Sequence, residues 1–164
     1  MRLSTRSTYG LRALCELALN WEQGPVSVSA ISQKERLSIA YLEKLLNLLK
    51  HYGFVRSIRG SKGGYVLARD PGEISVGEII RALEGEGARL LYIEDRLQTD
   101  EEKNETPASR MISLLVKRLG MIISESLNSL SLKRLCSDPE VWNLIDPGDK
   151  AHVCQGQVRE LAHM

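Results

Sequence analysis

The sequence predicts a mainly α-helical fold with a small β-hairpin, arranged as a winged helix-turn-helix that is followed by one long helix. Three observations predict this fold. Residues 38–52 join a helix start signal to apolar residues at helical spacing. Residues 54–67 are typical of two short strands around a basic, glycine-rich turn. Residues 106–126 contain more apolar residues than one helix face requires.

Two helices are predicted ahead of this region, over residues 8–22 and 28–34. Gly24-Pro25 ends the first helix, and Ser27 caps the second. The apolar face of the first helix is predicted to consist of Leu11, Leu14, Cys15, Ala18 and Trp21. The residues expected to bring the second helix against the third are Ala30, Ile31 and Leu37.

The third helix begins at Ser38, whose side-chain oxygen can accept a free backbone N–H, and it stops at Gly53. Its core-facing stripe is predicted to be Ile39, Leu42, Leu45, Leu46 and Leu49. The side chains left for other faces are Ala40, Tyr41, Glu43, Lys44 and Asn47. Side chains of these types can reach the base edges and phosphates of DNA.

A hairpin with a basic tip follows this helix. Its predicted strands, Phe54–Ile58 and Tyr65–Leu67, are rich in β-branched and aromatic residues. The tip reads Arg59-Gly60-Ser61-Lys62-Gly63-Gly64, where glycine permits a positive φ and a close approach to phosphate. A nucleotide-binding P-loop is excluded, because Lys62 precedes the glycine pair and a strand follows. A helix that can enter a groove and a cationic loop beside it predict double-stranded DNA as the partner.

The net charge of +1 conceals an asymmetry. Residues 1–69 contain eleven Lys and Arg and four Glu, giving +7, whereas residues 70–164 contain eleven Lys and Arg and seventeen acidic residues, giving −6. This favours a polyanion as partner of the first half, and the alternative is chance segregation of solvated charge.

The sequence has no run of eighteen apolar residues and no apolar signal peptide near its start, so we expect a cytoplasmic protein without a membrane partner.

A fourth helix is predicted after Ser75, which forms a capping box with Glu78, and Gly85 ends it. Its buried face should contain Val76, Ile79, Ile80 and Leu83.

The domain organisation predicted from these features is a DNA-binding domain over 1–84, an acidic loop over 85–105, a dimerisation helix with a short packing helix over 106–136, and a C-terminal tail over 137–164.

The long helix opens at Thr106-Pro107, because proline fits the first helical turn. Its apolar residues lie on more than one face, which favours burial on two sides, against its own domain and against a second subunit, over a wholly internal position. The predicted dimer interface is Ile112, Leu115, Leu119 and Ile122. A short helical piece is expected at Leu132–Leu135.

Five segments of the chain occur in the order and spacing of a known family. They are Met1–Ser4, Tyr9–Leu14, Ser38–Leu46, Val55–Tyr65 and Ile74–Ile80. In them the chain resembles the Rrf-two (Rrf2) family of bacterial winged-helix transcription regulators. The resemblance implies a homodimer that binds a pseudo-palindromic operator, and we expect it to act as a repressor. It also implies that Glu43 reads a base edge, where a carboxylate can accept from cytosine, and that Arg59 enters a minor groove.

Other candidate DNA contacts set the register of the domain on the duplex. Ser38, Tyr41, Lys44 and Lys62 are predicted to hold phosphates. The remaining candidates near the chain start and in the wing are Arg2, Arg6, Gly60 and Ser61. As alternatives, Glu43 is an ordinary exposed helix residue paired with Lys50, and Arg59 serves only to keep the turn soluble.

The chain departs from the family in one respect. Many relatives carry three cysteines before the dimer helix, and these bind an iron–sulfur cluster. Residues 85–110 of this chain contain no cysteine and no histidine, and Tyr92, Gln98 and Asn104 stand near the expected ligand positions. The chain is therefore similar to the cluster-free members, such as the repressor of cysteine metabolism, and this likeness implies a regulatory partner enzyme.

The three cysteines are widely spaced. Cys15 and Cys136 are expected to be core residues. No cofactor is expected, although His152 and Cys154 offer an alternative metal or thiol-based signal in the tail. The sequence carries no catalytic motif, so an enzyme is not expected. The alternative to a DNA-binding regulator is a winged-helix protein-interaction module without DNA binding.

Overall fold

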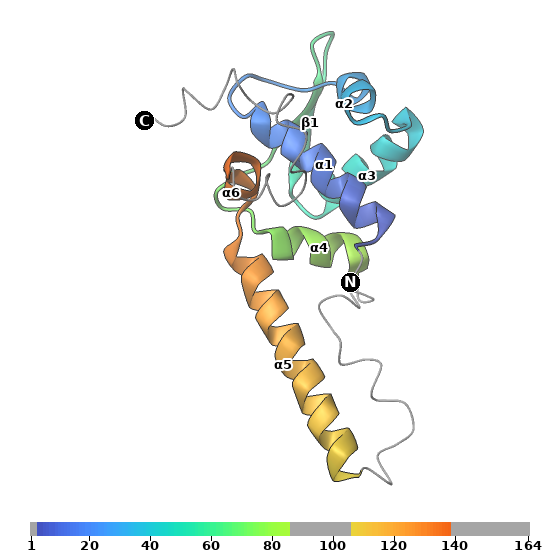
Figure 1. Cartoon of the computed structure of the whole chain (residues 1–164). Helices are drawn as coiled ribbons and strands as arrows, with labels where there is room; N and C mark the ends of the chain where they lie inside the picture. The colour runs from blue at the N-terminus through green and yellow to red at the C-terminus, as the bar shows by residue number, and fades with distance from the viewer. Residues whose placement is uncertain (1–2, 86–105, 139–164) are drawn as a thin grey trace, which may run out of the picture.

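The computed structural model describes residues 3–85 and 106–138 (Figure 1). Predictions for Arg2, the acidic loop and the tail, including Tyr92, His152 and Cys154, lie outside the described residues. The elements are α1 (Thr5–Leu19), α2 (Val28–Glu35), α3 (Ile39–His51), β1 (Val55–Ile58), β2 (Gly64–Leu67), α4 (Val76–Glu84), α5 (Pro107–Ser129) and α6 (Leu132–Ser137). The mainly α-helical fold with a small hairpin is confirmed.

The start and stop signals of the helices explain most boundaries. Ser27, Ser38, Ser75 and Thr106 each cap the helix that follows them, as their side chains accept a backbone N–H. The first helix differs from its prediction, because it begins at Thr5 and ends at Leu19, three residues earlier at each end. Its cap is Ser4.

The main core is built around α1, which packs against α3, α4 and α6. Its apolar face was only partly predicted. Leu14 is fully buried, but the other buried apolar positions are Ala13 and Leu17, whereas Leu11, Cys15, Ala18 and Trp21 are partly buried at the edge of the core. When neighbouring helices cover a helix from several sides, the spacing of its apolar residues does not show which of them will be most deeply buried.

Two other apolar residues were wrongly assigned to contacts. In α3, Leu42, Leu45, Leu46 and Leu49 are buried as predicted. Ile39 is not part of the core, since it is 48% exposed. Ala30 of α2 is also exposed, so Ile31 and Leu37 make the contact with α3 that was expected of all three residues.

The hairpin pairs β1 with β2 in antiparallel register, from Val55 opposite Leu67 to Ile58 opposite Gly64. Val26, just ahead of α2, adds a short bridge to β2. Its N–H donates to the Tyr65 carbonyl oxygen at 3.0 Å, and the Tyr65 N–H donates back at 2.9 Å. The base of the wing is therefore tied to the helix-turn-helix.

The junction of α5 and α6 is fixed to the start of α4. The Val76 N–H donates to the Leu130 carbonyl oxygen at 2.8 Å, and the Leu132 N–H donates to the Ile74 carbonyl oxygen at 2.7 Å. Leu132 and Cys136 of α6 are buried in the main core. The main core thus contains residues from both sides of α5 in the sequence.

The long helix α5 extends away from the rest of the fold (Figure 1). Within the described structure, Gly120 is its only buried residue. Ile123 and Leu127 are partly buried against Val76 and Ile80 of α4. Seven other large apolar side chains of α5 are exposed by 46–71%, and they are Met111, Ile112, Leu114, Leu115, Leu119, Met121 and Ile122. Among the described helices, none is both long and apolar enough to cross a membrane.

Candidate nucleic-acid interface

The exposed edge of α3 is set by the burial of its opposite face. Ser38 caps the helix, with its Oγ accepting the Tyr41 N–H at 3.2 Å. Because the four leucines face the core, the polar side chains predicted to point elsewhere do so. Ala40, Glu43, Lys44 and Asn47 are exposed, and Tyr41 is half-buried. This edge offers a carboxylate, an ammonium and an amide to a groove.

Tyr41 is held by a chain of contacts that crosses three helices. Its ring meets the ring of Tyr9 edge-on, with centroids 6.0 Å apart and planes at 84°. The guanidinium of Arg12 lies 5.6 Å from the Tyr9 ring centroid. Arg12 Nε in turn donates to Glu35 Oε2 at 2.5 Å, and its second nitrogen donates to the Glu35 carbonyl oxygen at 2.7 Å.

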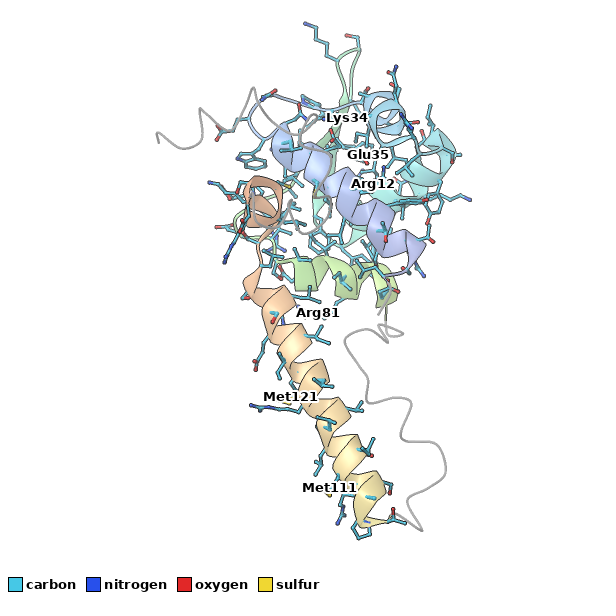
Figure 2. All side chains as sticks on the ribbon, in the orientation of Figure 1. Arg12, Lys34, Glu35, Arg81, Met111 and Met121 are labelled. Carbon is cyan, nitrogen blue, oxygen red and sulfur yellow. The ribbon has the colours of Figure 1, made fainter. Side chains whose placement is uncertain are left out.

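Sequence reasoning missed this support of Tyr41. Figure 2 shows Arg12, Lys34 and Glu35 gathered where α1 meets α2. No local pattern marks such residues, because they come from separate helices and meet only after packing. The only available signal was the presence of tyrosine and arginine on the less apolar side of α1.

Two ion pairs at the α1–α2 contact remove cations from the candidate interface. Arg12 pairs with Glu35, and Lys34 Nζ lies 2.8 Å from Glu16 Oε2. The Glu16 side chain is only 8% exposed, so Lys34 compensates a nearly buried carboxylate. Lys44, Arg59 and Lys62 are exposed and have no carboxylate partner in the described structure.

The wing tip is a tight turn that requires glycine. Gly60 has a φ of +124°, and the Gly63 N–H donates to the Gly60 carbonyl oxygen at 3.0 Å. A Cβ at Gly63 would collide with the carbonyl oxygens of Ile58 and Gly60. Arg59, Ser61 and Lys62 are exposed around this turn.

The orientation of the wing relative to α3 is fixed at its base. Lys50 Nζ, in the last turn of α3, donates to Ser57 Oγ on β1 at 2.9 Å. Lys50 is thus engaged by the wing rather than by Glu43. The hairpin projects beyond the helices into solvent (Figure 1). A basic loop and a polar helix edge are therefore joined through the base of the hairpin, where β1 packs against α3.

Two further sets of predicted residues can be placed. Arg6 is exposed near the start of α1, and Arg2 lies outside the described residues. The predicted dimer residues Ile112, Leu115, Leu119 and Ile122 are 55%, 54%, 46% and 47% exposed. Their spacing of three, four and three residues places them along one side of α5.

Of the two cysteines in the described structure, Cys136 is buried in the main core and Cys15 is partly buried against it. A hydrogen bond with the Cys136 thiol, together with burial, raises the pKa of the Cys15 thiol well above its usual value. The Cys15 thiol is therefore a poor metal ligand, because a metal binds the thiolate. In residues 3–85 and 106–138, no group of three His, Cys, Asp or Glu side chains could hold a metal ion.

The sequence matches one family over most of its length. Residues 3–138 match the profile of the Rrf2 family, which is described as an iron-dependent transcriptional regulator. The HTH-type transcriptional regulator CymR of Bacillus subtilis is 39% identical over 137 residues, which cover 84% of this chain and 91% of CymR. IscR of Pectobacterium atrosepticum is 31% identical over 162 residues, covering 98% of this chain and 95% of IscR.

Solved structures show the same likeness. The structure of CymR (YrzC), the global cysteine regulator of B. subtilis, superposes with a TM-score of 0.66 at 38% identity, covering 82% of this chain and 95% of CymR. The structure of T. potens IscR gives a TM-score of 0.63 at 32% identity, covering 92% of this chain and 93% of IscR. These relatives are regulators rather than enzymes.

Proposed function

The chain belongs to the Rrf2 family of transcriptional regulators, and we propose that it acts as a homodimeric repressor on a pseudo-palindromic operator. The observation that carries the proposal is the pairing of an exposed polar edge on α3 with an exposed basic wing. Each half of the operator would receive one α3 in the major groove and one wing in the adjacent minor groove.

The base-reading roles are assigned to Glu43 and Arg59. Glu43 is exposed near the start of α3, where a carboxylate can accept a hydrogen bond from the amino group of cytosine. Arg59 flanks the glycine turn, where its charge would be drawn to the negative potential of a narrow minor groove.

The phosphate contacts would fix the register of each subunit. They are proposed for Ser38, Tyr41, Lys44, Ser61 and Lys62, with the Gly60 backbone close to the strand. The Tyr9–Arg12–Glu35 chain supports this role for Tyr41, because it limits the positions that the phenol can take. Arg2 and Arg6 are proposed as further cationic contacts from the start of the chain.

The two subunits would associate through α5. In one subunit this helix leaves seven large apolar side chains exposed, which is unfavourable in water. Ile112, Leu115, Leu119 and Ile122 follow the spacing of a helix–helix seam, so a second α5 would cover them.

An iron–sulfur cluster held by thiolates does not fit this chain. Residues 85–110 contain neither cysteine nor histidine, and Cys15 and Cys136 are committed to the core. We propose a different input, for which a regulatory partner enzyme is one candidate and a thiol or metal signal at His152 and Cys154 is another. Protein purified without oxygen should be colourless and contain no stoichiometric iron by metal analysis, and a brown, iron-loaded protein would refute this.

The DNA-binding proposal is tested by binding measurements on an operator selected from random fragments. Affinity should fall steeply with salt, with a log–log slope of about −0.9 for each phosphate neutralised. Glu43→Ala should lose base preference at one position of each half-site while non-specific binding stays intact. Lys44→Ala is the matched control, and it should weaken binding equally on all sequences.

Two outcomes would contradict these assignments. A salt-independent affinity would favour a winged-helix protein-interaction module that does not bind DNA. An equal loss of affinity by Glu43→Ala on operator and random DNA would remove Glu43 from base reading.

A further inference from the structure

Ile39 is an exposed apolar residue of α3, whereas four leucines of the same helix are buried and Leu48 is partly buried. Leu42, Leu45, Leu46 and Leu49 are at most 3% exposed, whereas Ile39 is 48% exposed. Ile39 is the first residue of the helix, directly after the cap Ser38. The Ile39 side chain therefore contributes little to the core, although isoleucine is among the most apolar residues.

The start of α3 does not require an isoleucine at this position. Ser38 already satisfies a backbone N–H of the first turn. Leu37 and Leu42, on either side of the cap, are both buried and hold the positions of a hydrophobic staple. A β-branched side chain is also a weaker helix former than alanine, which occupies the next position, Ala40. Neither packing nor capping explains Ile39.

The position of Ile39 relative to Glu43 suggests a role. The two residues are four apart on one helix, which places their Cβ atoms about 5–6 Å from each other. Both side chains are exposed at the leading end of α3. A groove that receives the carboxylate of Glu43 would therefore also receive the side chain of Ile39.

We propose that Ile39 reads thymine by contacting its C5-methyl group, at a base pair next to the one read by Glu43. The thymine methyl is the main apolar group on the major-groove edges of the bases. An exposed isoleucine alone is unremarkable on a protein surface, so the inference depends on its place beside Glu43. It rests on the proposed function, in which α3 enters the major groove.

The test removes single methyl groups from the DNA. Each thymine of the selected operator is replaced symmetrically by uracil, which keeps every hydrogen bond of the base pair. Affinities of the full-length protein are then measured at fixed salt. For wild type, one replacement should weaken binding about fourfold per half-site, the factor that corresponds to about 0.8 kcal/mol for one buried carbon group.

The protein variants show which side chain contacts the methyl group. Ile39→Ala should lose a similar factor on the thymine operator and should not distinguish uracil from thymine at that position. Ile58→Ala is the matched control, because it truncates an isoleucine that is 40% exposed on β1. This control should remain as sensitive to uracil as wild type. Unchanged thermal unfolding of Ile39→Ala would show that the fold is intact.

Three results would overturn the inference. They are wild-type binding that is indifferent to every replacement, an Ile39→Ala variant as sensitive as wild type, and a selected operator without thymine beside the base read by Glu43. Each leaves the proposed function standing if wild type still prefers its operator over scrambled DNA. Loss of that preference would instead refute the proposed function itself.

Discussion

Arg59 has no carboxylate partner among residues 3–85 and 106–138, so within this part of the chain its charge is not neutralised by an ion pair. The guanidinium is exposed beside Gly60, whose φ of +124° lets the chain turn back sharply. Arg12, by contrast, is bound to Glu35 and Tyr9 and acts as a positioning residue. The two arginines have the same charge but different surroundings, and these surroundings support a positioning role for Arg12 and the proposed DNA contact for Arg59.

Arg59→Ala should weaken operator binding by about 1–3 kcal/mol, the scale of a specific contact. The loss of affinity should be larger on the operator than on random DNA. The operator is expected to have a narrow minor groove at this position, and such a groove attracts arginine more strongly than a groove of ordinary width. Fluorescence anisotropy on both DNAs measures this difference. Lys62→Ala is the control, and it should weaken both equally. A change within error for Arg59→Ala would exclude the wing from recognition.

At the scale of the elements, α4 is held against α5 by a close approach at Gly77. A Cβ at this position would meet the Asn128 side chain and come within 3.1 Å of the Asn128 backbone nitrogen. Asn128 Oδ1 also accepts a hydrogen bond from Arg81 at 2.7 Å, so the side chain cannot move away without losing it. This contact sets the direction in which α5 leaves the fold.

Gly77→Ala should therefore lower the free energy of unfolding by about 1–3 kcal/mol, as overpacking does. In an ordinary helix the same change would stabilise the protein, since glycine is a poor helix former. Chemical denaturation measures the effect. In the double variant Gly77→Ala with Asn128→Ala, part of the loss should be recovered. If the losses of unfolding free energy in the two single variants simply added up in the double variant, a steric clash between residue 77 and Asn128 would be excluded.

The exposed stripe on α5 makes a second prediction at this scale. Leu119→Glu places a charge in the centre of the proposed seam, where burial of an unpaired carboxylate is costly. Sedimentation should show a shift from dimer to monomer at micromolar concentration. Leu119→Met keeps an apolar side chain of similar volume and should remain dimeric. A Leu119→Glu protein that stays dimeric would place the interface elsewhere.

At the scale of the whole molecule, the start of α1 is fastened to the end of α4. Glu84 Oε1 accepts hydrogen bonds from the Ser4 N–H at 3.3 Å and from the hydroxyls of Ser4 and Ser7 at 2.5 Å. Burial alone would raise the pKa of Glu84. The hydrogen bonds, helped by the charge of Arg6, outweigh burial and lower this pKa below its ordinary value.

The lowered pKa gives the stability of the protein a defined pH dependence. The stabilisation is present above the unfolded-state pKa of about 4.3 and is lost as pH falls through the lower folded-state pKa. Glu84→Gln should therefore lower the free energy of unfolding at pH 7 by about 1 kcal/mol, the net scale of one hydrogen bond in a protein. Urea denaturation should show that the difference in unfolding free energy between wild type and Glu84→Gln becomes smaller below about pH 4.

The control for this prediction is Glu73→Gln, which removes an exposed carboxylate two residues before the α4 cap. This variant should match wild type at both ends of the pH range. A gap between Glu84→Gln and wild type that stays constant down to pH 3 would show that the charge of Glu84 does not stabilise the fold.

The sequence alone determined which helices and strands this protein forms, and it nominated the residues of the proposed DNA interface. Helix caps, apolar spacing and glycine stops act within a few residues, so Ser38, Ser75 and Gly53 could be assigned before any packing was known. The basic glycine turn of the wing is equally local. The candidate DNA-binding residues could be nominated for the same reason, because exposed polar groups on a short helix need no partner from elsewhere in the chain.

Only the tertiary structure decided which side chains of different helices and strands contact one another. It moved Ile39 out of the core, placed α6 against α1, and joined Tyr41 to Glu35 through Tyr9 and Arg12. It also brought Ser4 to Glu84, eighty residues away in the sequence. These contacts join residues that are distant in the chain, and their free energies depend on burial and distance, which local sequence patterns do not specify.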